Sequence, residues 1–532
     1  MTTNNDSQIA SLANARTVGD VLRLNAHRNG GRTAFETSNG HSVTFRQFNE
    51  RVNRLTNSIH ALGLKRRARV AILSRNRVEY VEFYGITKAG YIAVPLNWRL
   101  TPEEITGLIR DSGPELLIAD ELHRDMVERN RHAWPSVTHF VLLGGGTDFW
   151  LPYEDLLTDA STSEPAMAAL PDDVLCVIYT SGTTGAPKGV AISHRGALGN
   201  CRVAASEMLA LGEADRTMAV MPLFHVGGMW YHLFPSFASG CTALILPEFN
   251  PSHVLRELSQ REITNVHLVP TMIASLLADP AASTTNLPCL RLIFYAASSI
   301  PVDLLMRAMQ RWPRSRFAQS YGTTEVGVVT VLDPSDHLRA REPSSHHLLS
   351  SCGRPMTGRS VRIVDDAGAV CPPGSVAEIE VVSGDMMLGY WPKNRVSVAR
   401  SSWLKTGDVG YLDREGYLYI VDRKSDLIVT GGENVFPSEV EHHLCRDPAV
   451  LEAAVFGIAD SHWIERVVAA VVLRSGTRDD SQEIITRLRP HLAAYKCPKA
   501  IYVVEALPRS AAGKILRKEL RKQFAHAPER AS

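Results

Sequence analysis

The chain has 532 residues, which is too long for one compact core, so at least two domains are expected. Its 57 basic and 56 acidic side chains give a net charge of +1. This balance excludes the strong positive field that recruits nucleic acid or an anionic membrane. A small-molecule substrate is therefore the better expectation.

The N-terminal residues and the cysteines bear on where the protein works. Residues Met1–Asn14 are polar and have neither a basic start nor an apolar core, so no signal peptide is predicted. The eight cysteines form no Cys-x-x-Cys pair and show no metal-ligand spacing with histidine. Reduced, mostly buried thiols are the expected state. We therefore expect a cytoplasmic protein.

The first part of the chain alternates helical and strand patterns. Within Thr17–Asp120, a helix is predicted over Phe45–Leu62 and a strand over Arg69–Leu73. This alternation indicates an α/β domain. The apolar run Leu175–Tyr179 reads as a further buried strand.

The segment Tyr179–Val190 has the composition of a loop that holds polyphosphate. Glycines allow close approach of the backbone, hydroxyls and backbone N–H groups donate to phosphate oxygens, and Lys188 supplies a positive charge. The residues concerned are Thr180, Ser181, Gly182, Thr183, Thr184, Gly185, Lys188 and Gly189. The P-loop of the NTPases is excluded because Lys188 is followed by Gly189 and not by Ser or Thr. A flexible linker is the alternative interpretation.

Two later stretches concern the body of the protein. Met218–Leu246 is the most apolar long stretch, but prolines, glycines and histidines interrupt it, so we expect buried strands and loops and no membrane span. Ser344–Ser351 is predicted to form a surface loop.

The last hundred residues predict a small α+β unit. A strand over Tyr417–Val421 is followed by a charged segment, which is a candidate hinge. Ser438 and Glu441 match a capping box at the start of a helix. Further strands are expected at Ala453–Phe456 and Val467–Leu473, and a further helix at Gln482–Leu492.

A series of short motifs continues in order along nearly the whole chain. After Tyr179–Val190 come Tyr295-Ala-Ala-Ser-Ser299, Tyr321-Gly-Thr-Thr-Glu325, Thr406-Gly-Asp408, Asp422-Arg-Lys-Ser-Asp426, Thr430-Gly-Gly-Glu-Asn434 and Gly513-Lys514. In this order they resemble the adenylate-forming superfamily, which includes acyl-CoA synthetases, nonribosomal-peptide adenylation domains and beetle luciferases. The resemblance implies a large N-terminal multi-subdomain α/β domain (residues 1–422), a hinge (423–426) and a small mobile C-terminal α+β lid domain (427–532).

The resemblance also implies the first half-reaction, in which a carboxylate and ATP form an acyl-adenylate. It assigns magnesium to Glu325 and Thr184, phosphate binding to Lys188, a place near the carboxylate to His225, and a bridge between carboxylate and α-phosphate to Lys514. It assigns ribose binding to Asp408 and Arg423. The remaining nucleotide site comprises Ala297, Ser298, Tyr321, Gly322, Thr323 and Thr324.

Resemblance to the CoA-using branch implies that coenzyme A passes Gly431 and Gly432. Trp463 and Tyr495 are then candidates for contact with its adenine end, and Arg99 or Lys496 for contact with its phosphates. The chain departs from the usual pattern at three positions. Cys497 stands where some relatives have arginine, Ile464 where glycine is common, and Ser425 where Asp or Lys is usual at the hinge pivot.

The segment Met221–Trp230 resembles the acyl-pocket segment of acyl-CoA synthetases that accept fatty or aryl acids. An amino-acid substrate is disfavoured, because no Asp lies between Val220 and Gly228 to hold an α-amino group. A medium- or long-chain fatty acid and an aromatic or phenylpropenoic acid both stay open. A carrier protein is the alternative acceptor to coenzyme A, luciferase-like oxidation finds no specific support, and a homodimer is compatible with the sequence.

Overall fold

The computed structural model describes residues 14–145, 149–180, 187–392, 396–397, 402–430, 433–460, 463–477, 481–510 and 514–525. The chain divides into two compact units, Met1–Ser360 with Val382–Trp403, and Val361–Val381 with Leu404–Ser532. The mixed α/β architecture predicted from the sequence is confirmed. The second unit includes residues on the N-terminal side of the predicted hinge at 423–426. Residues 361–381 and 404–422 belong to it because they form strands that pack within this unit.

One sheet of the first unit has nine described strands. Its order is β16 (Arg354–Pro355), β15 (Gly327–Leu332), β14 (Arg316–Thr323), β13 (Leu292–Tyr295), β12 (Asn265–Leu268), β10 (Arg216–Ala219), β11 (Thr242–Ile245), β1 (Thr33–Thr37) and β2 (Ser42–Thr44). From β14 to β1 all neighbours are parallel.

A second sheet of nine described strands belongs to the same unit. Its order is β20 (Val396–Ser397), β19 (Gly389–Trp391), β9 (Lys188–Ser193), β8 (Val174–Thr180), β4 (Ile92–Pro95), β3 (Arg69–Leu73), β5 (Leu116–Asp120), β6 (His139–Leu143) and β7 (Trp150–Pro152). The strands predicted at Arg69–Leu73 and Leu175–Tyr179 are confirmed as β3 and β8.

Both sheets contain the same doubly wound arrangement of five described parallel strands. The two orders are β4-β3-β5-β6-β7 and β11-β10-β12-β13-β14. In each, the strand that comes first along the chain, β3 or β10, occupies the second position in the sheet. In such sheets ligands bind beyond the carboxyl ends of the strands. The carboxyl ends of β10, β12, β13 and β14 are therefore candidate positions for a ligand, and so are those of β3, β4, β5 and β6.

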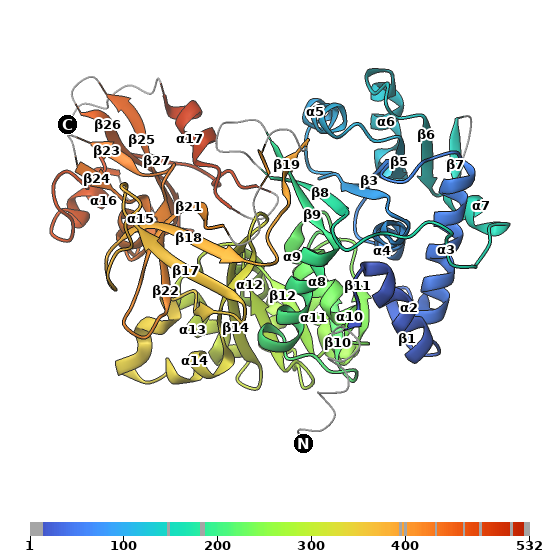
Figure 1. Ribbon diagram of the computed structural model, residues 1–532. Helices are drawn as coiled ribbons and strands as arrows, with labels where there is room; N and C mark the ends of the chain where they lie inside the picture. Colours follow the sequence, from blue (N-terminus) through green and yellow to red (C-terminus); the bar gives the residue numbers. More distant parts are fainter. Residues whose placement is uncertain are drawn as a thin grey trace. The chain divides into compact units, whose positions relative to one another are not determined.

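Helices cover these sheets because their apolar stripes match the buried strand faces. In Figure 1, α5 and α6 lie on one side of β3 and β5, and α4 lies on the other. The helix predicted over Phe45–Leu62 is confirmed as α3. The described α-helices of the first unit are α2 (Val18–Arg28), α3 (Phe45–Ala61), α4 (Val78–Gly85), α5 (Pro102–Ser112), α6 (Arg124–Asn130), α7 (Tyr153–Thr158), α8 (His194–Val203), α9 (Val226–Gly228), α10 (Phe234–Ala238), α11 (Pro251–Gln260), α12 (Pro270–Ala278), α13 (Val302–Arg311) and α14 (Pro334–Arg339).

Shorter turns of helix join these elements. They include the 3₁₀ turns η1 (Ile86–Ala89), η2 (Glu121–His123), η3 (Arg131–Ala133), η6 (Pro280–Ser283) and η7 (Pro343–Ser350), and the π turns η4 (Ala204–Met208) and η5 (Met229–Leu233). The predicted surface loop Ser344–Ser351 is thus helical over most of its length. Its Leu348 and Leu349 are buried and anchor it to the body of the unit.

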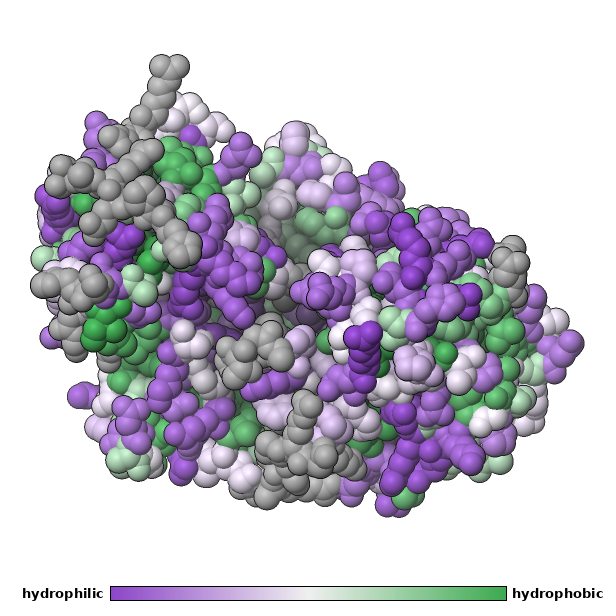
Figure 2. Space-filling model, turned by 90° about the horizontal axis from the view of Figure 1, so that it is seen from above, coloured by the Kyte–Doolittle hydropathy of each residue, from purple (hydrophilic) through white to green (hydrophobic). Residues whose placement is uncertain are grey.

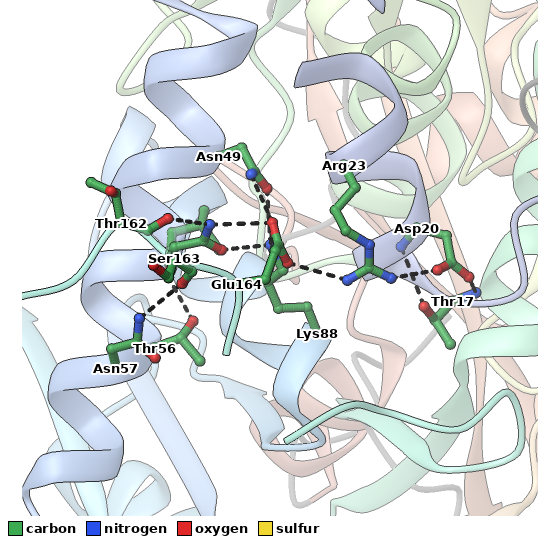
Figure 3. Close-up of polar contacts among 12 residues, drawn as sticks. Thr17, Asp20, Arg23, Asn49, Thr56, Asn57, Lys88, Thr162, Ser163 and Glu164 are labelled. Atoms are coloured by element: carbon green, nitrogen blue, oxygen red, sulfur yellow. Dashed lines mark hydrogen bonds and ion pairs between the residues drawn. The ribbon is translucent and has the colours of Figure 1, made fainter. Parts of the chain in front are cut away.

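A buried lysine fastens the segment that leads from α7 to β8. The side chain of Lys88 on η1 has no exposed surface, and its Nζ lies 2.8 Å from Glu164 Oε2. It also donates to the side-chain oxygens of Asn49 and Asn53 on α3, at 2.9 and 2.6 Å. Figure 3 shows Arg23 reaching the same carboxylate from α2. A Cβ atom on Gly19 would lie 2.7 Å from Lys88 Cβ, so only glycine lets α2 approach η1 this closely.

The second unit is built around two sheets. One has the order β17 (Arg359–Val364), β18 (Ala377–Ser383), β21 (Leu404–Leu412) and β22 (Leu418–Arg423). The other has the order β24 (Glu433–Val435), β23 (Ile428–Thr430), β26 (Ile464–Leu473) and β25 (Val450–Asp460), with β27 (Ala500–Val503) also paired to β26. Its helices are α15 (Pro437–Cys445), α16 (Ser481–Leu488) and α17 (Arg517–Phe524).

The strands predicted in this unit are confirmed, but two helix boundaries are corrected. The capping box at Ser438 is wrong, because α15 already begins at Pro437 and its N-cap Phe436 makes no side-chain cap. Ser438 Oγ donates instead to the Val421 carbonyl. The helix predicted to reach Leu492 ends at Leu488, two residues before Pro490, which disfavours helical backbone in the residue preceding it.

One face of the molecule shows how polar and apolar side chains are distributed. On the face shown in Figure 2, hydrophilic side chains cover most of the described surface and apolar ones form separate groups. No helix within the described parts of the chain is both long and apolar enough to cross a lipid bilayer.

Candidate active site

The predicted phosphate-binding loop connects two paired strands. Thr180 at the end of β8 lies opposite Lys188 at the start of β9, and its hydroxyl donates to the Lys188 carbonyl at 3.4 Å. The strand pairing therefore fixes both ends of the loop. Its predicted ligands Ser181, Gly182, Thr183, Thr184 and Gly185 lie outside the described residues.

Lys188 and Glu325 meet through a residue that the sequence analysis missed. Tyr390 lies on β19, which pairs with β9 so that Tyr390 faces Val190. Lys188 Nζ lies 5.2 Å from the centroid of the Tyr390 ring, and the Tyr390 hydroxyl donates to Glu325 Oε1 at 3.3 Å. Burial, reinforced by the Glu325 carboxylate, raises the pKa of Tyr390 to about 12. The hydroxyl is thus a permanent donor at neutral pH.

The carboxyl end of β13 carries backbone strain at a predicted nucleotide contact. Ala297 has a φ of +77°, in the left-handed region that side chains with a Cβ avoid. Such strain concentrates at ligand-binding sites, where the surrounding structure enforces it. Ala297 is exposed and Ser298 partly exposed, so both are accessible to a ligand within their own unit.

β14 positions the next motif along the same edge. Tyr321 is 8% exposed, and the turn that follows it brings the backbone of Gly322 close to Gly327. A Cβ on Gly322 would lie 2.1 Å from the Gly327 carbonyl oxygen, so glycine is required there. Thr323 Oγ1 accepts from the N–H of Val326 at 3.4 Å and closes the turn that carries Thr324 and Glu325.

The segment after β10 forms a wall beside this edge. His225 is the N-cap of α9, and its carbonyl accepts from the N–H of Met229. Gly228 permits the tight approach, because a Cβ there would lie 2.4 Å from the Pro222 carbonyl oxygen. Trp230 is buried against Tyr84 and Phe234, with ring centroids 5.2 and 5.1 Å apart. The tryptophan therefore belongs to the core behind the wall.

The predicted ribose ligands form an ion pair in the second unit. Asp408 on β21 lies opposite Arg423 on β22, and Arg423 Nε is 3.1 Å from Asp408 Oδ1. The N–H of Asp408 donates to Thr406 Oγ1 at 3.1 Å, and Gly407 has a φ of +75°. This turn and the pairing of β21 with β22 place the carboxylate and the guanidinium side by side.

The predicted coenzyme A contacts are only partly described. Gly431 and Gly432 lie outside the described residues. Trp463 is 38% exposed, with Lys499 Nζ 5.6 Å from its ring centroid. Ile464 has a φ of +72°, which explains why glycine suits this position.

Two further candidates for coenzyme A contact neighbouring side chains. Lys496 Nζ lies 2.7 Å from Glu439 Oε1 and 5.8 Å from the centroid of the Tyr495 ring. Arg99, in the first unit, lies with its guanidinium carbon 4.5 Å from the centroid of the Trp98 ring.

Lys514 is exposed, and its backbone pairs with that of Ser510. Its N–H donates to Ser510 Oγ at 3.2 Å, and the N–H of Ser510 donates to the Lys514 carbonyl at 2.7 Å. An antiparallel bridge joins the neighbouring residues Arg509 and Ile515. These contacts hold the backbone of Lys514 beside that of Ser510.

A cavity of about 420 Å³ lies elsewhere, at the carboxyl ends of β3 and β5. Several of its charged side chains are paired with one another. Arg51 Nε lies 2.5 Å from Glu82 Oε1, and Arg77 Nε lies 2.8 Å from Glu79 Oε2. We do not assign this cavity to the reaction, because none of the predicted site residues lines it.

Comparison with known proteins decides the family. The sequence model of the AMP-binding enzyme family matches residues 22–391, and that of the AMP-binding enzyme C-terminal domain matches residues 439–514. The chain belongs to the AMP-binding enzyme family. The predicted resemblance is confirmed, and Lys188, Glu325 and Tyr390 all lie within the first match.

Three similar proteins of this family illustrate its range. The chain is 34% identical to a feruloyl-CoA synthase of Amycolatopsis sp over 91% of this chain and 94% of that protein. It is also 34% identical to the fatty acid–[acyl-carrier-protein] ligase ScoC of Streptomyces coeruleorubidus, over 91% and 92%. The crystal structure of the anthranilate CoA ligase AuaEII in complex with anthranoyl-AMP matches with a TM-score of 0.85 and 29% identity, over 95% of this chain and 97% of that one.

Proposed function

We propose that the protein is an ATP- and Mg²⁺-dependent acid:CoA ligase. In the first step a carboxylate oxygen of the acid attacks the α-phosphate of ATP, and pyrophosphate leaves. In the second step the thiol of coenzyme A attacks the carbonyl of the acyl-adenylate, and AMP leaves. The observation that supports this most strongly is the joining of Lys188 and Glu325 through Tyr390 in a chain of the AMP-binding enzyme family.

The first step requires the protein to neutralise phosphate charge and to bring two anions together. We assign Lys188, Thr180 and the loop residues Ser181, Gly182, Thr183 and Gly185 to the phosphates. Tyr321, Gly322, Thr323, Thr324, Ala297 and Ser298 bind the adenosine end, and Asp408 and Arg423 bind the ribose. His225 lies at the acid carboxylate, and Lys514 offsets the repulsion between carboxylate and α-phosphate.

Magnesium suits the donors that the first unit offers. Mg²⁺ is usually held by one or two carboxylates together with waters and substrate phosphates. Glu325 supplies a carboxylate oxygen that is already hydrogen-bonded by Tyr390, and we assign Thr184 as its neighbour. Among the described residues, no group of three or more His, Cys, Asp or Glu side chains could hold a metal by itself. The proposed ion therefore depends on ATP phosphates, where it would offset their negative charge.

The second step needs an opening for the pantetheine arm of coenzyme A. We assign this passage to Gly431 and Gly432 and contacts with the nucleotide end to Trp463 and Tyr495. A carrier protein is a second candidate acceptor, since the 34% identical ScoC is named as an acyl-carrier-protein ligase. The adjacent exposed side chains of Trp463 and Ile464 would suit either acceptor.

The acceptor can be tested with one acid that the enzyme adenylates. Pyrophosphate release is measured with Mg²⁺ and ATP, first without an acceptor and then with coenzyme A or with an acyl carrier protein bearing its pantetheine arm. We expect repeated turnover only with coenzyme A, and no turnover after Mg²⁺ is removed by a chelator. Turnover with the carrier protein and none with coenzyme A would instead show that the protein loads a carrier protein. The eight cysteines form no disulfide among the described residues, which favours a cytoplasmic setting for this activity.

A further inference from the structure

His267 on β12 has a buried nitrogen that no described residue satisfies. The residue is 2% exposed, and its Nδ1 lies 3.2 Å from the Gly227 carbonyl oxygen. A carbonyl only accepts, so Nδ1 carries the proton and Nε2 presents a lone pair. Within the described part of the chain, Nε2 is buried and has no hydrogen-bond partner. A buried acceptor in this state is costly unless something outside the fold satisfies it.

Another buried histidine shows the usual solution. His337 is 1% exposed, and both of its ring nitrogens are paired, Nε2 with the Tyr295 hydroxyl at 2.9 Å and Nδ1 with the Asp333 carbonyl at 2.8 Å. His194 also has an unsatisfied Nε2 among the described residues, but it lies at the start of α8 beside α2. His267 differs from both because it lies at the carboxyl edge of the sheet.

The surroundings of His267 are aromatic. The Phe294 ring centroid lies 4.5 Å from that of His267, and the His232 centroid lies 5.7 Å away. His232 is itself paired, with Nε2 3.0 Å from Asn265 Oδ1. Burial lowers the pKa of His267 to about 3, so the ring stays neutral. His267 Nε2 is thus an uncharged hydrogen-bond acceptor surrounded by aromatic side chains.

His267 also touches the segment assigned to the acid. It pairs in register with Phe294, three residues before Ala297, and it bonds to Gly227 in the wall that follows β10. A Cβ on Gly227 would lie 3.3 Å from His267 Cε1. A side chain at position 227 would therefore crowd this edge of the imidazole, next to the partly exposed residues 225–227.

We propose that His267 Nε2 accepts a hydrogen bond from a donor on the acid substrate. The preferred substrates are then aromatic acids that carry a ring hydroxyl or N–H group, ahead of unsubstituted fatty acids. This inference rests on the proposed ligase function and narrows its substrate class. His267 determines specificity and takes no part in the bond-forming steps.

The test compares cinnamate with its ortho-, meta- and para-hydroxy derivatives and with decanoate. For each acid, kcat/KM for acyl-CoA formation is measured with the unmodified protein. We expect the best hydroxycinnamate to exceed cinnamate by about 10- to 100-fold, the range for one neutral hydrogen bond whose absence leaves a buried group unpaired. We expect decanoate to fall below both.

Two variants locate the preference at His267. His267→Phe keeps an aromatic ring but removes the acceptor, so the ratio of hydroxycinnamate to cinnamate should fall to about one while cinnamate turnover stays within about threefold. His267→Gln retains a side-chain acceptor and should keep part of the preference. It also serves as the second variant if His267→Phe does not fold.

The outcomes separate this inference from the proposed function. Three results would overturn the role of His267 without affecting the proposed ligase function. They are a hydroxycinnamate-to-cinnamate ratio of kcat/KM near one in the unmodified protein, an unchanged ratio in His267→Phe, and a preference for decanoate. The absence of acyl-CoA from every acid in the panel would overturn the ligase and with it this inference.

Discussion

Tyr390 links the proposed magnesium ligand to the proposed phosphate-binding lysine. Its hydroxyl donates to Glu325 and its ring faces the ammonium group of Lys188. A ring face attracts a cation, and a donated hydrogen bond restricts the carboxylate. We therefore regard Tyr390 as a positioning residue for both charges.

Tyr390→Phe should weaken magnesium use. At 3.3 Å the lost hydrogen bond is worth roughly 1 kcal/mol, or about fivefold. We expect ATP–pyrophosphate exchange to need about fivefold more Mg²⁺ for half its maximal rate, with the rate largely restored at saturating Mg²⁺. Tyr411→Phe, in the second unit and stacked on Tyr419, is the matched control and should change nothing. An unaltered Mg²⁺ requirement in Tyr390→Phe would remove Tyr390 from the site.

Ile464 is strained in a way that one substitution can relieve. Its φ of +72° costs a residue with a Cβ about 1–2 kcal/mol, whereas its side chain is 65% exposed and gains little from burial. Ile464→Gly should raise the free energy of unfolding by about 0.5–1 kcal/mol, after allowing for the greater freedom of glycine in the unfolded chain. Urea denaturation measures the difference. Ile464→Ala keeps the Cβ and should show no such gain, and a destabilised glycine variant would refute the strain.

At the scale of elements, the contacts of Lys88 hold α2, α3 and η1 to the segment that carries Glu164. The Lys88 ammonium lowers the pKa of the Glu164 carboxyl from 4.5 to about 2, with help from Asn49 and Asn53 and against the effect of burial. The folded state therefore binds the Glu164 proton less tightly than the unfolded state. Stability from this group is fully present above pH 4.5 and is lost as the pH falls toward 2.

Glu164→Gln should remove this pH-dependent stability. A shift of this size corresponds to at most about 3 kcal/mol. Because the side chain is 40% exposed, we expect about 1–2 kcal/mol. Urea unfolding at several pH values should show a constant deficit in the free energy of unfolding between pH 6 and 7, below the Lys88 pKa of about 8, and this deficit should shrink as the pH is lowered from 5 to 4. Asp159→Asn, an exposed change in the same segment, is the control, and a deficit independent of pH would contradict the account.

At the scale of the whole molecule, the proposed residues divide between two compact units. Lys188, Glu325 and Tyr390 belong to the first, whereas Asp408, Arg423 and Lys514 belong to the second. The two half-reactions should therefore depend differently on the second unit. Lys514→Ala should lower acyl-adenylate formation by at least about 100-fold, while thioester formation from supplied acyl-adenylate and coenzyme A stays within a few-fold. Equal loss of both steps would argue against this division of labour.

The sequence predicted those parts of the structure that depend on local pattern. Arg69–Leu73 is a buried apolar run, and the structure has a strand with the same limits. The proposed site was predictable only as motifs in order along the chain. Tyr390 carried no signal, because β19 meets β9 only through pairing between residues far apart in sequence. The unsatisfied nitrogen of His267 likewise depends on Gly227, on a different segment. The capping box failed because Pro437 had already started the helix.

The proposed ligase is tested most directly by the products of one reaction. The protein is incubated with ATP, Mg²⁺, coenzyme A and a panel of fatty, aryl and phenylpropenoic acids, and AMP and acyl-CoA are quantified together. We expect one class of acid to give AMP and acyl-CoA in equal amounts, with neither product formed when the acid is omitted. AMP or pyrophosphate formed without acyl-CoA for every acid would contradict the account.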